Sequence, residues 1–238
     1  MNLVLFEASE LHYPLARSDR RVRHILDVLR RPVGAPFDAG VINGPRGQAT
    51  LLALGPEAVT FAFTPLVPAL PRSPITLIIG LPRPQTARDI LRDATTLGAD
   101  AIHFVRLEKS ERSYAQSSLW HSGEWRRHLI AGAEQAFATG LPEVTHDQSL
   151  TTVLATLAMG GRRLALDNYE ATESLGAPRA AATQVVLAIG GERGWSTNER
   201  GQFRAHGFQL VHLGTRVLRT ETAVTAGLAI IQTQLGLM

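Results

Sequence analysis

Two arginines and a glutamate stand in the segment LGTRVLRTETA, where an apolar strand-like run passes into an apolar helix-like run. We expect such a junction to be largely buried. Thr220 is predicted to cap the following helix, and Glu221 lies in its first turn, so both have a structural role. Arg216 and Arg219 have none. A buried guanidinium needs a partner, which here is Glu192, Glu221, or the carboxylate or phosphate of a ligand.

A loop with three glycines precedes this segment. The stretch LAIGGERGWS ends a strand-like run with Gly190, Gly191 and Gly194. Ser196 followed by Glu199 fits a capping box, which accounts for both residues at the start of a helix. Glycines that end a buried strand let backbone groups approach a ligand closely, although a plain tight turn explains them equally well. Two charged glycine loops so close in sequence together indicate a binding site.

The elements that must position these loops fall into two predicted domains, over residues 1–70 and 71–238, joined by the proline-rich stretch PALPRSP. In the first, DRRVRHILDVLRR (19–31) has apolar residues at helical spacing. The runs FDAGVING, GQATLLALG and AVTFAFTPLV, separated by Gly, Asn and Pro, then predict a small β-barrel.

In the second domain, predicted strands and helices alternate along the chain. This alternation predicts an α/β fold in which helices cover both faces of a parallel sheet. A parallel sheet favours a nucleotide-type ligand at the carboxyl ends of its strands. The predicted strands cover residues 75–80, 101–107, 162–167, 184–190 and 208–214, and the predicted helices cover residues 83–98, 122–139 and 149–158.

The amino-acid composition is that of a globular protein whose positive charge is almost all arginine. A hydrophobic fraction of 45% and a charged fraction of 19% are typical of a globular chain with a real core. The pI is about 9.9 although the net charge is only +3, because Lys109 is the only lysine and arginine carries the other positive charges. Arginine suits phosphate and base recognition, but a GC-rich coding sequence explains this bias equally well.

The sequence lacks the residues and motifs of several common kinds of site and segment. No cysteine is present, so disulfides, thiolate metal sites and cysteine nucleophiles are excluded. The scattered histidines predict no metal site. No apolar run approaches the ~20 residues of a membrane span, and the N-terminal stretch does not resemble a signal peptide, so we expect a cytoplasmic protein. The P-loop, the G-x-G-x-x-G fingerprint after the first α/β strand and the G-x-S-x-G elbow are missing.

The motif IGGERGWS followed by LGTRVLRTETA resembles the knotted carboxyl-terminal end of SPOUT methyltransferases. More narrowly, it resembles the ribosomal RNA small subunit methyltransferase E family, which methylates N3 of a uridine in bacterial 16S rRNA. VRHILDVLR followed by VG is similar to that family's N-terminal PUA-like RNA-binding barrel. EKSERS (108–113) is similar to its basic–serine loop, and AEQAFATGLPEV to its helix-to-proline turn. The resemblance covers nearly the whole chain.

The chain departs from the family pattern at several positions. The family usually reads G-P-E-G-G where this chain reads Gly-Gly-Glu-Arg-Gly, with Gly191 and Arg193 as the differences. It usually carries an arginine at the position of Ala138, and a K-A-T-E-L-G helix end where this chain has Asp93 and Thr96. These departures concern RNA or dimer contacts more than the cofactor loop.

The resemblance implies a SPOUT domain with a trefoil knot that holds S-adenosylmethionine (SAM), with adenine against the backbone of the second glycine loop. The implied catalytic residues are Arg219, Glu221 and Arg112. The implied cofactor-binding residues are Leu166, Ile189, Gly190, Gly191, Glu192, Gly194, Leu213, Gly214, Val217, Leu218, Arg219, Thr222 and Ala223. The implied RNA-binding residues are Arg17, Arg23, His24, Arg30, Arg31, Lys109, Ser110, Arg112 and Arg216.

The implied chemistry begins with uracil N3, which is a poor nucleophile while protonated. Loss of the proton spreads negative charge onto the flanking oxygens, which an arginine can stabilise as an oxyanion hole does. Arg219 is the first choice, with Arg216 or Arg112 acting across a dimer as alternatives. Glu221 or Glu192 takes the proton or fixes an arginine.

The resemblance also implies a homodimer and, as partner, 16S rRNA in the small ribosomal subunit. AVTAGLAIIQTQLGL near the end of the sequence is apolar on more than one face, which suits burial against a second subunit. Two alternative functions remain at this stage. One is a SPOUT methyltransferase that acts on tRNA or another rRNA site, and the other is a non-catalytic RNA-binding protein with the same fold.

Overall fold

The computed structural model describes residues 3–158, 160–178 and 180–238. The chain divides into two compact units. One consists of the residues up to Pro71 together with Ala133–Leu141, and the other of Arg72–Gly132 and Pro142–Met238. The inclusion of residues 133–141 in the first unit was not foreseen from the sequence, which places the boundary near residue 70 and assigns everything beyond it to the second domain.

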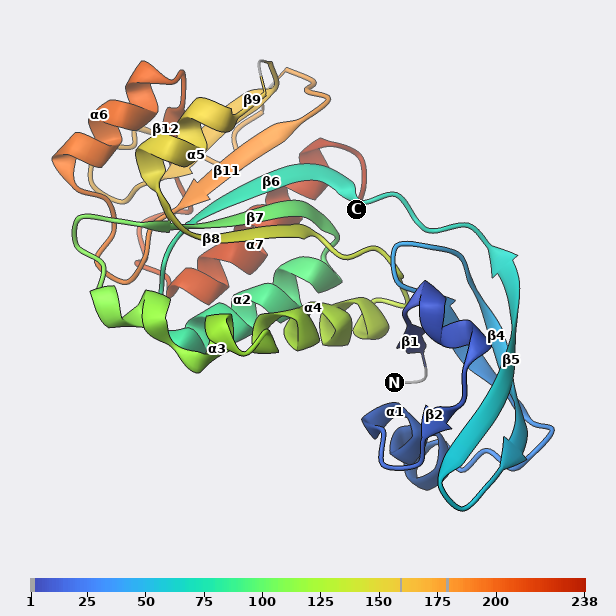
Figure 1. Cartoon of the computed structure of the whole chain (residues 1–238). Coiled ribbons are helices and arrows are strands. Elements are labelled where there is room, and N and C mark those ends of the chain that lie inside the picture. The colour runs from blue at the N-terminus through green and yellow to red at the C-terminus, as the bar shows by residue number, and fades with distance from the viewer. Residues whose placement is uncertain (1–2, 159, 179) are drawn as a thin grey trace. The chain divides into compact units, whose positions relative to one another are not determined.

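The first unit contains a curled five-stranded sheet in the order β1-β3-β4-β5-β2 (Figure 1). β1 runs parallel to β3, and the other pairs are antiparallel. Phe6 and Phe61 stack inside it with ring centroids 4.6 Å apart. The strands are β1 (Val4–Phe6), β2 (Leu15–Ala16), β3 (Pro36–Val41), β4 (Arg46–Leu54) and β5 (Ala58–Val67), and a 3-10 helix, η1, spans Ala8–His12.

The helix predicted over residues 19–31 is shorter and changes type. Asp19 caps α1 (Arg20–Arg23), which continues as the π-helical turn η2 (His24–Val28). Val22 and Ile25 are buried in the core of this unit, as their helical spacing predicts. The helix ends early because Arg30 takes a left-handed backbone conformation with φ of 50°.

Residues 133–141 join the first unit through hydrogen bonds to the turn between β3 and β4. The buried Thr139 hydroxyl donates to the Gly44 carbonyl oxygen at 2.6 Å, and the Leu141 amide donates to Asn43 Oδ1 at 2.9 Å. The Arg46 guanidinium donates to the Phe137 carbonyl oxygen at 2.6 Å. These contacts end the helix predicted over residues 122–139 at Gln135.

The second unit is built on a parallel sheet of seven strands in the order β10-β12-β9-β11-β6-β7-β8. The predicted parallel α/β fold is confirmed, because every pair of neighbouring strands runs parallel. The strands are β6 (Ser73–Gly80), β7 (Ala99–Arg106), β8 (Glu143–Ser149), β9 (Arg162–Leu166), β10 (Glu173–Ser174), β11 (Val185–Ile189) and β12 (Gln209–His212).

Helices cover both faces of this sheet. α2, α4 and α7 lie on one face, and α5 and α6 lie on the other (Figure 1). The helices are α2 (Pro84–Thr96), α3 (Ser118–His121), α4 (Glu124–Gln135), α5 (Leu150–Thr156), α6 (Thr197–Ala205) and α7 (Thr220–Gln234), and a 3-10 helix, η3, spans Arg112–Gln116.

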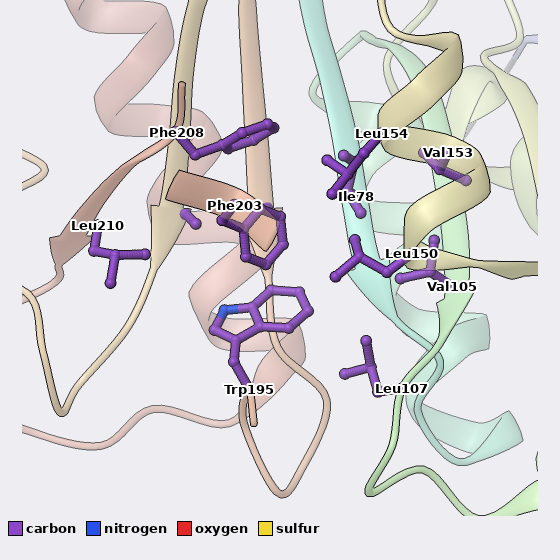
Figure 2. Close-up of a cluster of buried hydrophobic side chains, with 12 residues drawn as sticks. Ile78, Val105, Leu107, Leu150, Val153, Leu154, Trp195, Phe203, Phe208 and Leu210 are labelled. Carbon is purple, nitrogen blue, oxygen red and sulfur yellow. The ribbon is translucent and has the colours of Figure 1, made fainter. Parts of the chain in front are cut away.

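A buried apolar cluster fills the space between the sheet and the α5–α6 face. In Figure 2, Trp195 and Phe203 lie together opposite Leu150 of α5. The Trp195 ring meets the Phe203 ring edge-on, with centroids 4.6 Å apart. Trp195 is only 1% exposed. The cluster therefore anchors the end of the first glycine loop to the core.

Candidate functional site

A cavity of about 430 Å³ opens beyond the carboxyl ends of β9, β11 and β12 and beside the start of α7. This is the edge at which parallel α/β sheets bind their ligands. The cavity is lined by Arg83, Thr86, Leu166, Asp167, Asn168, Tyr169, Ile189, Gly190, Gly191, Glu192, Arg193, Gly194, Trp195, Leu213, Arg216, Val217, Leu218, Arg219, Thr220, Glu221 and Ala223.

The first glycine loop, residues 190–195, packs closely against the end of β6. A Cβ atom on Gly191 would lie 3.3 Å from the Gly80 carbonyl oxygen, and Gly194 has a φ of 60°. The Glu192 carboxylate accepts a hydrogen bond from the Arg83 amide at 3.0 Å, and Trp195 Nε1 donates to the Leu166 carbonyl oxygen at 2.8 Å. The loop is therefore held at several points, and close backbone approach explains Gly191.

Glu199 joins the first glycine loop to the basic–serine loop 108–113. The predicted capping box is confirmed, because Glu199 accepts from the Ser196 amide at 2.7 Å while Ser196 Oγ accepts from the Glu199 amide at 3.1 Å. The same carboxylate, which is 2% exposed, also accepts from the Glu108 amide at 2.8 Å. Lys109 Nζ donates to the Trp195 carbonyl oxygen at 3.3 Å, so the chain's single lysine reinforces this connection.

Glu108 adds a further bond between the same two segments. Asn198 Nδ2 donates to its carboxylate at 2.7 Å. This hydrogen bond, with a second from Ser196, lowers the pKa of the Glu108 carboxyl below its ordinary value. The charged form of Glu108 is therefore favoured where the basic–serine loop meets the start of α6.

The second glycine loop, residues 213–219, differs from its prediction. The junction is not largely buried, since Arg216 and Arg219 are exposed. Thr220 does not cap the final helix either. The N-cap position of α7 is Arg219, and the buried Thr220 hydroxyl lies 3.4 Å from the Gly190 carbonyl oxygen, to which it donates. The prediction of Thr220 as the cap was wrong, because its hydroxyl binds a carbonyl oxygen 30 residues away, which local sequence does not reveal.

The two arginines of this loop are available to a ligand. Among the described residues, neither Arg216 nor Arg219 makes a side-chain hydrogen bond or ion pair, although Glu192 and Glu221 line the same cavity. A guanidinium group on the rim of a partly apolar cavity can bind a phosphate or stabilise negative charge that develops on a substrate.

Nearly all the predicted cofactor-binding residues line the cavity. The exceptions are Gly214 and Thr222. Gly214 has a φ of 103° and its amide donates to His212 Nδ1 at 3.0 Å, so glycine is needed there for the backbone conformation of the loop. Thr222 is exposed on the first turn of α7.

Several cavity residues were missed by sequence reasoning. Arg83 and Thr86 come from the start of α2, and Asp167, Asn168 and Tyr169 follow β9. The position of residues 167–169 directly after a predicted strand was an available signal. The other lining residues that the sequence does not predict are Arg193, Trp195 and Thr220.

The other departures have local partners. Asp93 pairs with Arg92 at 2.9 Å. The Thr96 hydroxyl lies 3.0 Å from the Arg92 carbonyl oxygen and 3.1 Å from that of Gly132. Ala138 is half-buried in the first unit.

Two of the predicted RNA-binding residues, Arg23 and His24, line a second cavity, of about 560 Å³, within the first unit. Arg20 and Glu134 also line it, and burial raises the pKa of the Glu134 carboxyl. Arg17 donates to the Gly55 carbonyl oxygen at 3.2 Å. The exposed Arg30 and Arg31 follow η2.

The rest of the predicted RNA-binding set belongs to the second unit. Lys109 and Ser110 line a small cavity of about 80 Å³ beside the first glycine loop. Ser110 Oγ accepts from the Leu107 amide at 3.2 Å. Arg112, predicted as catalytic and RNA-binding, begins η3 and does not line the main cavity, whereas Arg219 and Glu221 do.

The main cavity fits a bent nucleoside cofactor such as SAM. Its volume falls within the range of roughly 300–1,000 Å³ that is usual for small-molecule sites. Its buried lining combines the apolar Ile189, Trp195 and Ala223 with the polar Thr86, Asp167 and Thr220, and the half-buried Gly190, Gly191 and Gly194 bring backbone close to the cavity. These residues could therefore hold an adenine ring and satisfy its polar edge.

Neither a metal centre nor a membrane span is found in the part of the chain that the structure describes. No group of three or more His, Asp or Glu side chains there could hold a metal ion. None of the helices formed by the described residues combines the length and the apolar character that a membrane crossing requires.

Fold and site together define an RNA methyltransferase domain, and the family model of that description matches residues 69–232. The chain is 39% identical to a ribosomal RNA small subunit methyltransferase E from Treponema pallidum, over 97% of this chain and 90% of the relative. A Neisseria gonorrhoeae enzyme of the same name, solved bound to SAM, is 26% identical with a TM-score of 0.78, over 98% and 97% of the two chains.

A probable rRNA methyltransferase from Porphyromonas gingivalis shares the fold, with a TM-score of 0.84, 23% identity and 99% of each chain covered. The chain belongs to the ribosomal RNA small subunit methyltransferase E family. The predictions of this family and of a SAM-dependent RNA methyltransferase are therefore confirmed.

Proposed function

We propose that this chain transfers a methyl group from SAM to N3 of a specific uridine in the 16S rRNA of the small ribosomal subunit. The observation that carries the proposal is one cavity with two kinds of lining. Its buried lining includes the apolar Ile189, Trp195 and Ala223 beside a glycine-rich loop, as a nucleoside cofactor requires, and the exposed Arg216 and Arg219 have no ion pair among the described residues. The target position itself rests on the family resemblance, and so does the knot around residues 187–223.

In this reaction SAM supplies an electrophilic methyl group on its sulfonium. The residues of the chain make N3 reactive. As the N3–H proton leaves, Arg219 stabilises the negative charge that develops on the neighbouring uracil oxygen. Glu221, half-buried in the first turn of α7, accepts that proton or orients Arg219. The fixed first glycine loop holds the reacting groups in line, which is the other large contribution to rate.

The first unit is proposed to be a PUA-like RNA-binding barrel, with a domain boundary near residue 70. Its second cavity gathers Arg20, Arg23 and His24, and Arg20 and Arg23 have no ion pair in the described residues. Exposed arginines on one helix suit a phosphate backbone. Each phosphate contact would make RNA binding more sensitive to salt.

We also propose a homodimer formed through α7. Residues Thr222, Thr225, Ala226, Ala229, Ile230 and Thr233 of α7 remain at least partly exposed. The Thr225 and Thr233 hydroxyls donate to carbonyl oxygens one turn earlier in α7, so these side chains present mainly methyl groups. Such a face can pack against another helix without leaving polar groups unsatisfied. Sedimentation at micromolar concentration should give a dimer, and a monomer would refute this part of the proposal.

The decisive experiment incubates the protein with unmodified small ribosomal subunits and SAM that carries a deuterated methyl group. Mass spectrometry of the digested 16S rRNA should find the label on N3 of one uridine. Label in tRNA or at another rRNA atom would redirect the proposal to a different substrate. Calorimetric binding of SAM without any RNA methylation would point to a binding protein instead. A substrate in the small subunit implies that the protein acts in the cytoplasm.

A further inference from the structure

Tyr169 is an exposed aromatic side chain on the rim of the SAM cavity. It is 82% exposed, although the cavity residues Ile189, Trp195 and Ala223 are at most 8% exposed. It follows β9 by three residues, and neither the capping signals nor the glycine motifs of the sequence single it out. An exposed tyrosine at the mouth of a binding cavity offers a flat face to a ligand.

The backbone around Tyr169 is fixed by a buried carboxylate. Asp167 Oδ1 accepts hydrogen bonds from the Tyr169 amide at 2.9 Å and the Glu170 amide at 2.6 Å. Asp167 Oδ2 pairs with Arg200 Nε of α6 at 2.7 Å, and the two side chains are 2% and 8% exposed. The turn that carries Tyr169 is thus held to α6 by a buried ion pair.

Arg200 also supports the tyrosine ring. Its guanidinium carbon lies over the ring, 5.3 Å from the centroid, and its Nη1 lies 3.5 Å from a Glu170 oxygen. Glu170 pairs in addition with Arg204. Burying an ion pair costs desolvation energy and adds little net stability, so this arrangement is better explained by the position that it gives to the exposed ring.

The lining residues of the cavity differ in how exposed they are, and the buried and exposed groups suit different ligands. The buried lining includes the apolar Ile189, Trp195 and Ala223, which suit the cofactor, and its one carboxylate, Asp167, is already paired with Arg200. The rim holds Tyr169 together with the exposed side chains of Arg193, Arg216 and Arg219. Exposed arginines beside an exposed aromatic ring are the combination that binds single-stranded nucleic acid, where bases stack on aromatic rings and guanidinium groups meet phosphates.

We propose that Tyr169 is the platform on which the unpaired target uracil stacks during methylation, and that Asp167 and Arg200 are positioning residues for it. The proposal rests on the function proposed above. A uracil held on this rim would share it with Arg219, at the mouth of the cavity that is proposed to hold SAM. Stacking would supply part of the energy needed to hold the base out of its RNA structure.

The test compares Tyr169→Ala and Tyr169→Phe with the wild-type chain in single-turnover methylation of unmodified small ribosomal subunits at a range of subunit concentrations. Thr151→Ala is the control, because Thr151 is also exposed in the second unit but lies on α5 and does not line the cavity. We expect Tyr169→Ala to lower kcat/KM for RNA roughly ten- to hundredfold, as the loss of one base–aromatic stack does. Tyr169→Phe should stay within about threefold of wild type, since it keeps the ring.

Three controls keep the result unambiguous. SAM affinity, measured by calorimetry without RNA, should be the same for wild type and Tyr169→Ala, and a parallel loss would assign the ring to the cofactor and overturn the proposal. The melting temperature should not change because the side chain is exposed. If the wild-type chain does not methylate the subunits, the proposed function fails, and this outcome is distinct from a Tyr169→Ala variant that methylates at the wild-type rate.

A last measurement identifies the stacked base. Small subunits reconstituted with an abasic site at the mapped uridine should bind wild type and Tyr169→Ala equally well, because no target base is left to stack. If the wild-type chain still binds these subunits more tightly, Tyr169 contacts another part of the RNA and the assignment to the target base is wrong.

Discussion

The two glycine loops that line the main cavity have similar origins but differ in how firmly they are held. Each follows a strand of the same parallel sheet and leads into a helix. The first loop, residues 190–195, is tied down through Glu192, Trp195 and the Glu199 carboxylate. The second loop, residues 213–219, leaves its two arginines exposed and without an ion pair among the described residues.

This difference indicates that the two loops have different roles, the first in binding the cofactor and the second in acting on the substrate. A cofactor site benefits from a loop whose shape is fixed before the ligand binds, since little ordering remains to be done. Groups that stabilise charge present only in the transition state must be available to the substrate, and an arginine already paired with a carboxylate is less so. Changes in the first loop should therefore affect stability, and changes in the second should affect rate or binding.

The largest expected effect is that of Arg219→Ala. Loss of one group that stabilises a developing anion should slow single-turnover methylation by about two to three powers of ten. SAM affinity and the melting temperature should hardly change, because Arg219 has no side-chain partner among the described residues. Lysine should restore only part of the rate, since it lacks the planar fork of arginine. An alanine variant that methylates at the wild-type rate, or that simply unfolds, would show that Arg219 is structural.

Gly214→Val should act through the backbone of the second loop. A Cβ atom there would meet nothing within 4 Å, but the φ of 103° is strained for any residue except glycine. We expect a penalty of about 1–3 kcal/mol, seen in calorimetry as SAM affinity weakened roughly tenfold or more. Gly207→Val is the matched control, because Gly207 has a φ of 74° and equally open surroundings but lies before β12, outside the second glycine loop, whose neighbouring residues Leu213 and Arg216 line the cavity. Equal SAM affinities for the two variants would contradict the placement of the cofactor.

Glu199→Ala should test the constraint on the first loop. It leaves the amides of Ser196 and Glu108 without their acceptor, so the free energy of unfolding should fall by about 1–3 kcal/mol. Urea denaturation would measure this loss, and Glu199→Gln, which keeps one acceptor oxygen, should lose less. A stable Glu199→Ala variant with normal SAM affinity would mean that the first loop holds its shape without this carboxylate.

The smallest effect is expected at Glu108, and it should depend on pH. Because its folded pKa lies below the ordinary value of 4.5, the folded state favours the charged form. Its contribution to stability is therefore present above pH 4.5 and is lost as the pH falls through the lower, folded-state pKa. Urea denaturation should give a small difference between wild type and Glu108→Ala at neutral pH that shrinks on acidification. A difference that grows with acidity would reverse the assigned sign.

Local patterns in the sequence were enough to predict much of this architecture. The alternation of apolar strand-like runs with helix-like segments predicted the parallel sheet, because such apolar strands need burial on both faces. Ser196 and Glu199 gave a correct helix start because a capping box lies within four residues. β8 was missed because EVTHDQS is polar, and the structure shows why this is tolerated: β8 is an edge strand that is only half-buried.

The sequence by itself thus determined the family, the kind of cofactor, the two glycine loops and most of the residues along the cavity. Tertiary structure alone decided that Thr220 serves Gly190 rather than the helix cap, that Glu199 also binds Glu108, and that Asp167 meets Arg200 beneath Tyr169. The reason is physical. Periodicity and capping depend on residues a few positions apart, but these partners are 30 to 91 positions apart, and only the order of the strands in the sheet brings them together.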